Sequence, residues 1–189
     1  MSRHPRFNLI APVALALAAA MLASGCTVLF VPRKPDASPS PTPVTVVHRF
    51  LDLEARLPDT IGGQTVEKFS LTTDPASQTP KTLEVLRRLD KTTSDLQVAK
   101  GFLGNSTDFR LSALRILGSD AARAAVAFEQ IDEGDPNSNT LYQPATVAGK
   151  RVIIRKTGDT TDYMYPLGDT IFVVGGARPL VEEALTKIK

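Results

Sequence analysis

The chain has 189 residues, enough for one ordinary domain, and its 42% apolar and 22% charged residues are typical of soluble globular proteins. Two of its 22 basic residues, Arg3 and Arg6, precede Cys26 and no acidic residue does, so the chain from Cys26 onward has 20 basic and 20 acidic residues. This balance excludes the broad cationic surface with which nucleic-acid-binding proteins displace counterions from phosphates.

The first segment has the organisation of a secretory signal peptide. Residues 1–6 carry two arginines, residues 8–24 are almost wholly apolar, and small residues follow. The apolar run is near the lower limit for crossing a bilayer and Pro12 interrupts it, which favours a signal peptide over a permanent transmembrane helix. A signal anchor in which the cysteine has no role is the alternative.

The end of this leader reads LASGC, from Leu22 to Cys26, and resembles the lipobox of bacterial lipoproteins. The resemblance implies cleavage between Gly25 and Cys26 and acylation of Cys26, which would anchor the protein in the cell membrane on its extracytoplasmic side. Ala23 departs from the pattern, because the family usually has Leu there. Cys26 is the only cysteine, so no disulfide can form within one chain.

A spacer separates the anchor from the folded part. Residues 35–45 read PDASPSPTPVT, and repeated prolines favour extended chain over helix or buried core. We therefore expect a signal peptide over residues 1–25, a lipidated cysteine and linker over 26–45, and a single globular domain over 46–189.

The first half of that domain predicts two helices around one strand. Apolar residues recur at helical spacing over 46–57, and Pro58 ends this pattern. Alternation over 66–73 predicts a half-buried strand. Thr79 followed by Pro80 is a favourable N-cap and first position for the second helix.

A hairpin and a third helix follow. Residues 95–102 and 108–117 alternate in polarity around the turn-forming GNST, which predicts two paired strands. Ser119 is the expected N-cap of the next helix, which ends in the EGDPNSN loop. Its inner stripe is expected to contain Ala121, Ala124, Ala125, Phe128 and Ile131.

The last third predicts a meander and a closing helix. The turn sequences AGK, GDTTD and LGD separate apolar runs, including RVIIRK, YMYP and TIFVVGG. Pro179 opens a helix with Val181, Ala184, Leu185 and Ile188 on one face.

Together these elements predict an α+β domain, an antiparallel sheet with helices packed on one face. Two finer arrangements are compatible with the order of elements. One is a split βαβ unit. The other is a duplicated helix-hairpin-helix unit, because TIGGQTV at 60–66 echoes TVAGKRV at 146–152.

Residues for catalysis or metal binding are few. His48 is the only histidine after the leader, which excludes sites that need two histidines, and its place near the first helix favours an exposed surface side chain. No phosphate-binding glycine motif occurs. We expect no cofactor, no metal and no enzymatic activity.

Two acidic groups are interpreted as solvated, one at a helix end that runs into a turn and the other within a turn. Asp132, Glu133 and Asp135 superficially suggest calcium, but their spacing does not follow an EF-hand loop. Asp159 and Asp162 fall in the GDTTD turn.

Tyr142, Tyr163 and Tyr165 form a candidate binding surface, because tyrosine favours interfaces and the last two share a strand face. Packing into the core is the competing interpretation.

These observations favour a non-enzymatic lipoprotein that binds an envelope protein or has a structural role. The segments LPDTIGG and GDTIFVVGG, behind a lipobox and a Pro-rich stalk, resemble lipoproteins of actinobacteria and related lineages, a resemblance that implies no particular activity. A carrier of a lipid or apolar small molecule is the alternative, and it would need an apolar cavity. A carboxylate-dependent enzyme is a third hypothesis.

Overall fold

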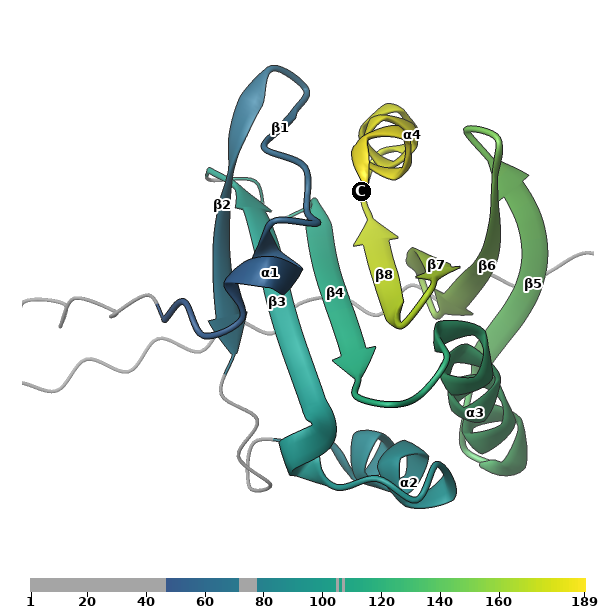
Figure 1. The fold of residues 1–189 in the computed structure, drawn as a ribbon. Coiled ribbons are helices and arrows are strands. Elements are labelled where there is room, and N and C mark those ends of the chain that lie inside the picture. Colours follow the sequence, from purple (N-terminus) through teal and green to yellow (C-terminus); the bar gives the residue numbers. More distant parts are fainter. Residues whose placement is uncertain (1–46, 72–77, 105, 107) are drawn as a thin grey trace, which may run out of the picture. The chain divides into compact units, whose positions relative to one another are not determined.

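The computed structural model describes residues 47–71, 78–104, 106 and 108–189. Cys26, Gly25 and the expected linker lie outside this range. Within it the chain forms an eight-stranded antiparallel sheet with four α-helices, so the expected α+β class is confirmed (Figure 1).

The order of strands across the sheet is β1-β2-β3-β4-β8-β7-β6-β5. The strands are β1 (Thr60–Ile61), β2 (Gln64–Leu71), β3 (Leu96–Leu103), β4 (Arg110–Ile116), β5 (Thr140–Val147), β6 (Lys150–Thr157), β7 (Thr160–Leu167) and β8 (Thr170–Gly175).

Two meanders of four strands each, β1 to β4 and β5 to β8, meet at one antiparallel pair, β4 with β8. The register of that pair runs from Arg110 opposite Gly175 to Arg115 opposite Thr170. In a split βαβ unit the two strands joined by the helix are parallel, and one other strand lies between them. Here β2 and β3, which the helix over Pro80–Arg88 joins, are antiparallel neighbours, and three strands separate β4 from β5, which the helix over Ala121–Gly134 joins. The split βαβ expectation is therefore wrong.

Helices cover both faces of the sheet. They are α1 (Leu51–Glu54), α2 (Pro80–Arg88), α3 (Ala121–Gly134) and α4 (Arg178–Lys187), and a short 3₁₀ helix, η2, spans Thr93–Asp95. One buried cluster joins α1 and α4 to the sheet, and a second joins α2 and α3 to it. Figure 1 shows α2 and α3 together at one end of the strands.

Strand β8, near the middle of the sheet, has apolar side chains that pack on both faces, so helices must cover both faces. On β8, Phe172 and Val174 belong to the cluster beneath α1 and α4, whereas Ile171 and Val173 lie in the other. Because successive side chains point to opposite faces, a strand that is apolar at every position needs cover on both sides. The expectation of helices on one face is therefore wrong.

The helix ends follow local chemistry, with one correction. The Thr79 hydroxyl accepts a hydrogen bond from the Thr82 N–H at 3.2 Å, which confirms the expected cap of α2. The cap of α3 is Asp120 rather than Ser119, because its carboxylate accepts from two backbone N–H groups, at 2.9 and 3.1 Å. The expected helix over 46–57 is reduced to the single turn of α1.

The echoing heptapeptides occupy two hairpins at opposite edges of the sheet. Gly62-Gly63 turns β1 into β2, and Ala148-Gly149 turns β5 into β6, with positive φ at all four residues. Ala148 tolerates φ +49° without the freedom of glycine. Val66 and Val152, the last residues of the two copies, lie in the same core cluster. The echo therefore marks one local structure used twice.

Candidate functional site: a pocket beneath two helices

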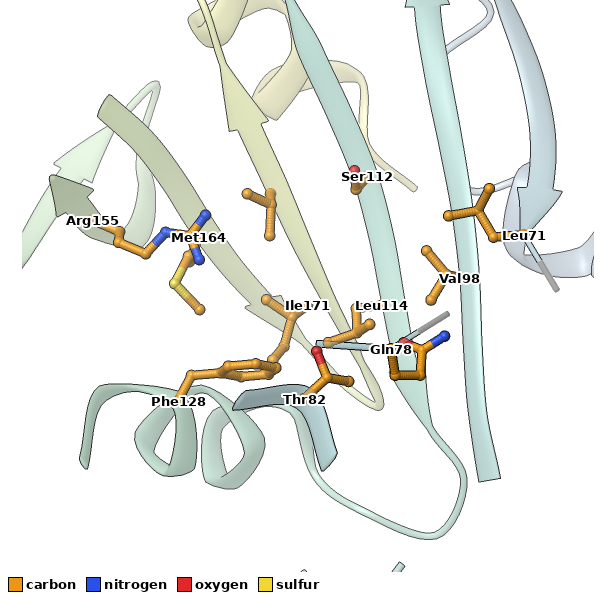
Figure 2. A pocket seen from close by; sticks show the side chains of 11 residues that line it. Leu71, Gln78, Thr82, Val98, Ser112, Leu114, Phe128, Arg155, Met164 and Ile171 are labelled. Atoms are coloured by element: carbon orange, nitrogen blue, oxygen red, sulfur yellow. The ribbon is translucent and has the colours of Figure 1, made fainter. Parts of the chain in front are cut away.

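A hollow lies between the sheet and helices α2 and α3. Its volume is about 420 Å³, within the range of about 300–1,000 Å³ that small-molecule sites occupy. The lining side chains come from strands β2, β3, β4, β6, β7 and β8, from helices α2 and α3 and from Gln78 just before α2, and Figure 2 shows them around this space. They are mostly apolar: Leu71, Gln78, Thr82, Val98, Ser112, Leu114, Phe128, Arg155, Met164, Ile171 and Val173.

The pocket lies at the margin of the sheet face on which α2 and α3 pack. On β4, Leu114 and Ile116 pack in the cluster beneath α2 and α3. Ser112 lies two residues earlier on the same face and is too small to fill the space beyond the helices. The alanine-rich face of α3 lets that helix lie close to the sheet, and Phe128 is the large side chain that reaches the pocket from it. A small residue on the strand thus leaves an apolar hollow.

Arg155, on β6, is the one charged residue among those that line this pocket. Its Nη2 donates to Asp162 Oδ2 at 2.7 Å, and Asp162 also accepts from Arg110 Nη2 at 3.0 Å. Burial alone would lower the pKa of the Arg155 guanidinium, but the hydrogen bond and charge of Asp162 outweigh it and raise that pKa. Within the described part of the chain, the buried Arg155 Nε has no acceptor.

Asp162 was expected in a solvated turn, and this expectation is wrong. The residue lies inside β7 and is only 5% exposed. The turn is shorter than predicted: it consists of two residues and ends at Asp159, and the strands on either side of it pair from Thr157 and Thr160 onward. Two guanidinium groups compensate the cost of burying this carboxylate.

A second pocket, of about 330 Å³, adjoins the first and shares Arg155 with it. All of its lining residues are polar, and they come from α2, α3 and strands β5 to β7. It consists of Lys81, Asp132, Thr140, Arg155, Thr157, Thr160 and Asp162.

Asp132 joins the two helices at this polar pocket. Lys81 on α2 and Tyr142 on β5 both donate to its carboxylate, and Ser138 Oγ donates to it at 3.3 Å. Burial opposes ionisation, but these donors outweigh it and lower the pKa of Asp132. Burial and the adjacent carboxylate together raise the pKa of the Tyr142 hydroxyl.

The sequence interpretation of Asp132 as a solvated helix end is therefore wrong, since it is 2% exposed. Its neighbours Glu133 and Asp135 are exposed, as expected, and so is Asp159. Helical spacing explains the difference, because Asp132 follows Phe128 by one turn on the inner face of α3.

The three candidate tyrosines do not share one surface. Tyr163 and Tyr165 are each 9% exposed and lie in the core beneath α1 and α4. Tyr142 packs against the cluster on the opposite face. Arg178 lies over the Tyr163 ring at 5.5 Å, and Lys150 lies over the Tyr165 ring at 5.6 Å. Only Tyr142 adjoins the pockets, through its bond to Asp132.

The expected surface position of His48 agrees with a half-exposed imidazole, whose Nδ1 lies 2.8 Å from Glu54 Oε2. Glu54 is buried and also accepts from the Ser70 hydroxyl. Among the described residues, no group of three or more His, Cys, Asp or Glu is arranged to hold a metal ion. None of the described helices is long and apolar enough to cross a membrane.

Sequence reasoning did not find either pocket, although it named several of their residues as strand or turn positions. A comparison with protein-family models, curated proteins and solved structures finds no match.

Proposed function

We propose that this chain is a lipid-anchored, extracytoplasmic and non-enzymatic protein that binds a small apolar molecule in the pocket beneath α2 and α3. The observation that carries the proposal is the 420 Å³ hollow with an apolar lining on a covered sheet face. It favours the carrier hypothesis over a purely structural role, since a fully packed core would leave no such space.

The driving force for such binding is removal of hydrocarbon from water. Val98, Leu114 and Ile171 present branched aliphatic surface, and Met164 adds a flexible side chain that adapts to different shapes. Each methylene transferred into such surroundings contributes about 0.8 kcal/mol. A ligand with an alkyl chain would therefore gain affinity with length until the pocket is filled.

The proposed anchor places this site at a bilayer. Acyl chains on Cys26 would hold the domain where apolar molecules partition, and residues 26–45 would form the tether. The test is Cys26→Ser. We expect the processed protein to lose its lipid mass and its retention in the membrane fraction, and unchanged mass and retention would refute the anchor.

The binding proposal is tested with Nile red, a neutral dye that fluoresces in apolar surroundings. Ser112→Phe places a ring in the pocket, while Ser112→Ala leaves the space open and serves as the matched control. We expect the parent and Ser112→Ala to bind the dye and Ser112→Phe to lose at least about tenfold in affinity. Equal binding by all three proteins, with unchanged circular dichroism, would refute the proposal.

One observation favours protein binding as a second candidate function. Phe69 and Phe102 stack with ring centroids 4.8 Å apart, and Phe102 is 42% exposed. They continue the rows of Leu71 and Val98 on the pocket face, beyond the cover of the helices. If this pair binds an envelope protein, Phe102→Ser will remove a copurifying partner from solubilised membranes without changing Nile red binding.

A further inference from the structure

The apolar pocket and the polar pocket adjoin each other, and we treat them as the two halves of one site. Arg155 lines both pockets, and Figure 2 shows its side chain among those that line the apolar one. The apolar half is bounded by residues such as Met164 and Phe128, and the polar half by side chains with hydrogen-bonding groups. A molecule that fills both halves must itself be amphipathic.

The polar half has no net charge. Among the side chains that line it, Lys81 pairs with Asp132 and Arg155 pairs with Asp162. Arg110 also donates to Asp162 but is not among the lining residues. A negatively charged head would lie beside both carboxylates, and a positively charged head would lie beside both cations. Because the charges are already compensated, neither head would gain a net attraction that repays its loss of water.

The remaining groups suit a head that both donates and accepts hydrogen bonds. The hydroxyls of Thr140 and Thr157 lie 2.9 Å apart, and Thr160 faces the same pocket from the start of β7. Each hydroxyl can donate one bond and accept two.

We infer that the ligand is an amphipathic molecule whose head is uncharged and rich in hydroxyl groups, as in an alkyl sugar. Its alkyl chain occupies the pocket beneath α2 and α3, and its head lies against the threonines of β5, β6 and β7. This inference rests on the proposed function, because the apolar pocket must hold the chain for the head to reach the polar one.

The test compares three ligands that share one decyl chain: decyl β-glucoside, decanoate and decyltrimethylammonium. Each is titrated below its critical micelle concentration against the protein with Nile red bound. We expect the glucoside to displace the dye at about tenfold lower concentration than either charged ligand. Thr157→Val with Thr160→Val should abolish that preference. Thr65→Val, at an exposed position of β2 outside both pockets, is the control and should change neither the preference nor the affinity for Nile red.

The outcomes separate the two proposals. If Nile red binds and Ser112→Phe blocks it, yet decanoate or decyltrimethylammonium competes as well as the glucoside, the hydroxylated head is refuted and the apolar pocket stands. A preference for the glucoside that survives both threonine substitutions also refutes the assignment to the polar pocket. Failure of Nile red to bind the parent protein refutes the site as a whole.

Discussion

Replacing Asp132 by asparagine tests whether the polar junction between α2 and α3 stabilises the fold. The substitution keeps the shape of the side chain but removes its charge. The carboxylate accepts from Lys81, Tyr142 and Ser138, and asparagine would place an amide N–H₂ near at least one of these donors. A donor facing a donor leaves a buried polar group without its bond.

The expected loss of unfolding free energy depends on the charge and exposure of the groups that contact Asp132. A hydrogen bond to a charged group contributes about 1.5–3 kcal/mol to stability. Lys81 is 36% exposed, so its ammonium can return to water, and the loss should lie below the cost of stranding a fully buried charge. We expect Asp132→Asn to lower the free energy of unfolding by about 2 kcal/mol at neutral pH.

Urea denaturation followed by circular dichroism measures this difference, with Glu133→Gln on the exposed side of the same helix as the control. The control should change stability by less than about 0.5 kcal/mol. Because the folded-state pKa of Asp132 is below its ordinary value of 3.8, its contribution is present above that value and is lost as the pH falls through the folded-state pKa. The difference in unfolding free energy between the parent and Asp132→Asn should therefore become smaller in acid. Equal stability at neutral pH, or a gap that widens in acid, would refute the reasoning.

Three further predictions concern the core, a turn and a helix. Phe172→Ala removes the largest fully buried side chain and should cost about 3–5 kcal/mol in urea denaturation, while Leu141→Ala on the exposed surface should cost little. Ala148→Gly relieves a positive φ and should raise stability by about 0.5 kcal/mol, and a decrease would contradict the strain argument. The Glu84 carboxylate, which accepts hydrogen bonds from two arginines on α2, should titrate by NMR with a pKa of about 2, and a midpoint near 4.5 would contradict those contacts.

Local chemistry made several elements predictable. The Thr79-Pro80 cap, the three turns of the C-terminal meander and the helix after Pro179 depend on neighbouring residues, and each occurs in the structure. The packing of helices on both faces depends on which strands become central. Strand β8 pairs with β4 across some fifty residues of intervening chain, and no local signal specifies that pairing.

The site was less predictable for the same reason. Val98, Leu114 and Ile171 have the pattern of core residues, and only the assembled helices show that a space remains above them. The burial of Asp132 and Asp162 likewise depends on Lys81 and Arg110, which approach from distant elements. An acidic residue is assigned to solvent by default, because its partner is not visible in the sequence.

The central claim is that a ligand binds beneath α2 and α3, and methyl NMR during a titration with decyl β-glucoside tests it most directly. We expect the methyl resonances of Val98, Met164 and Ile171 to shift with one saturable curve, while those of Val181 and Leu185 on the opposite face stay in place. Shifts confined to the opposite face, or none at all below the critical micelle concentration, would contradict the claim.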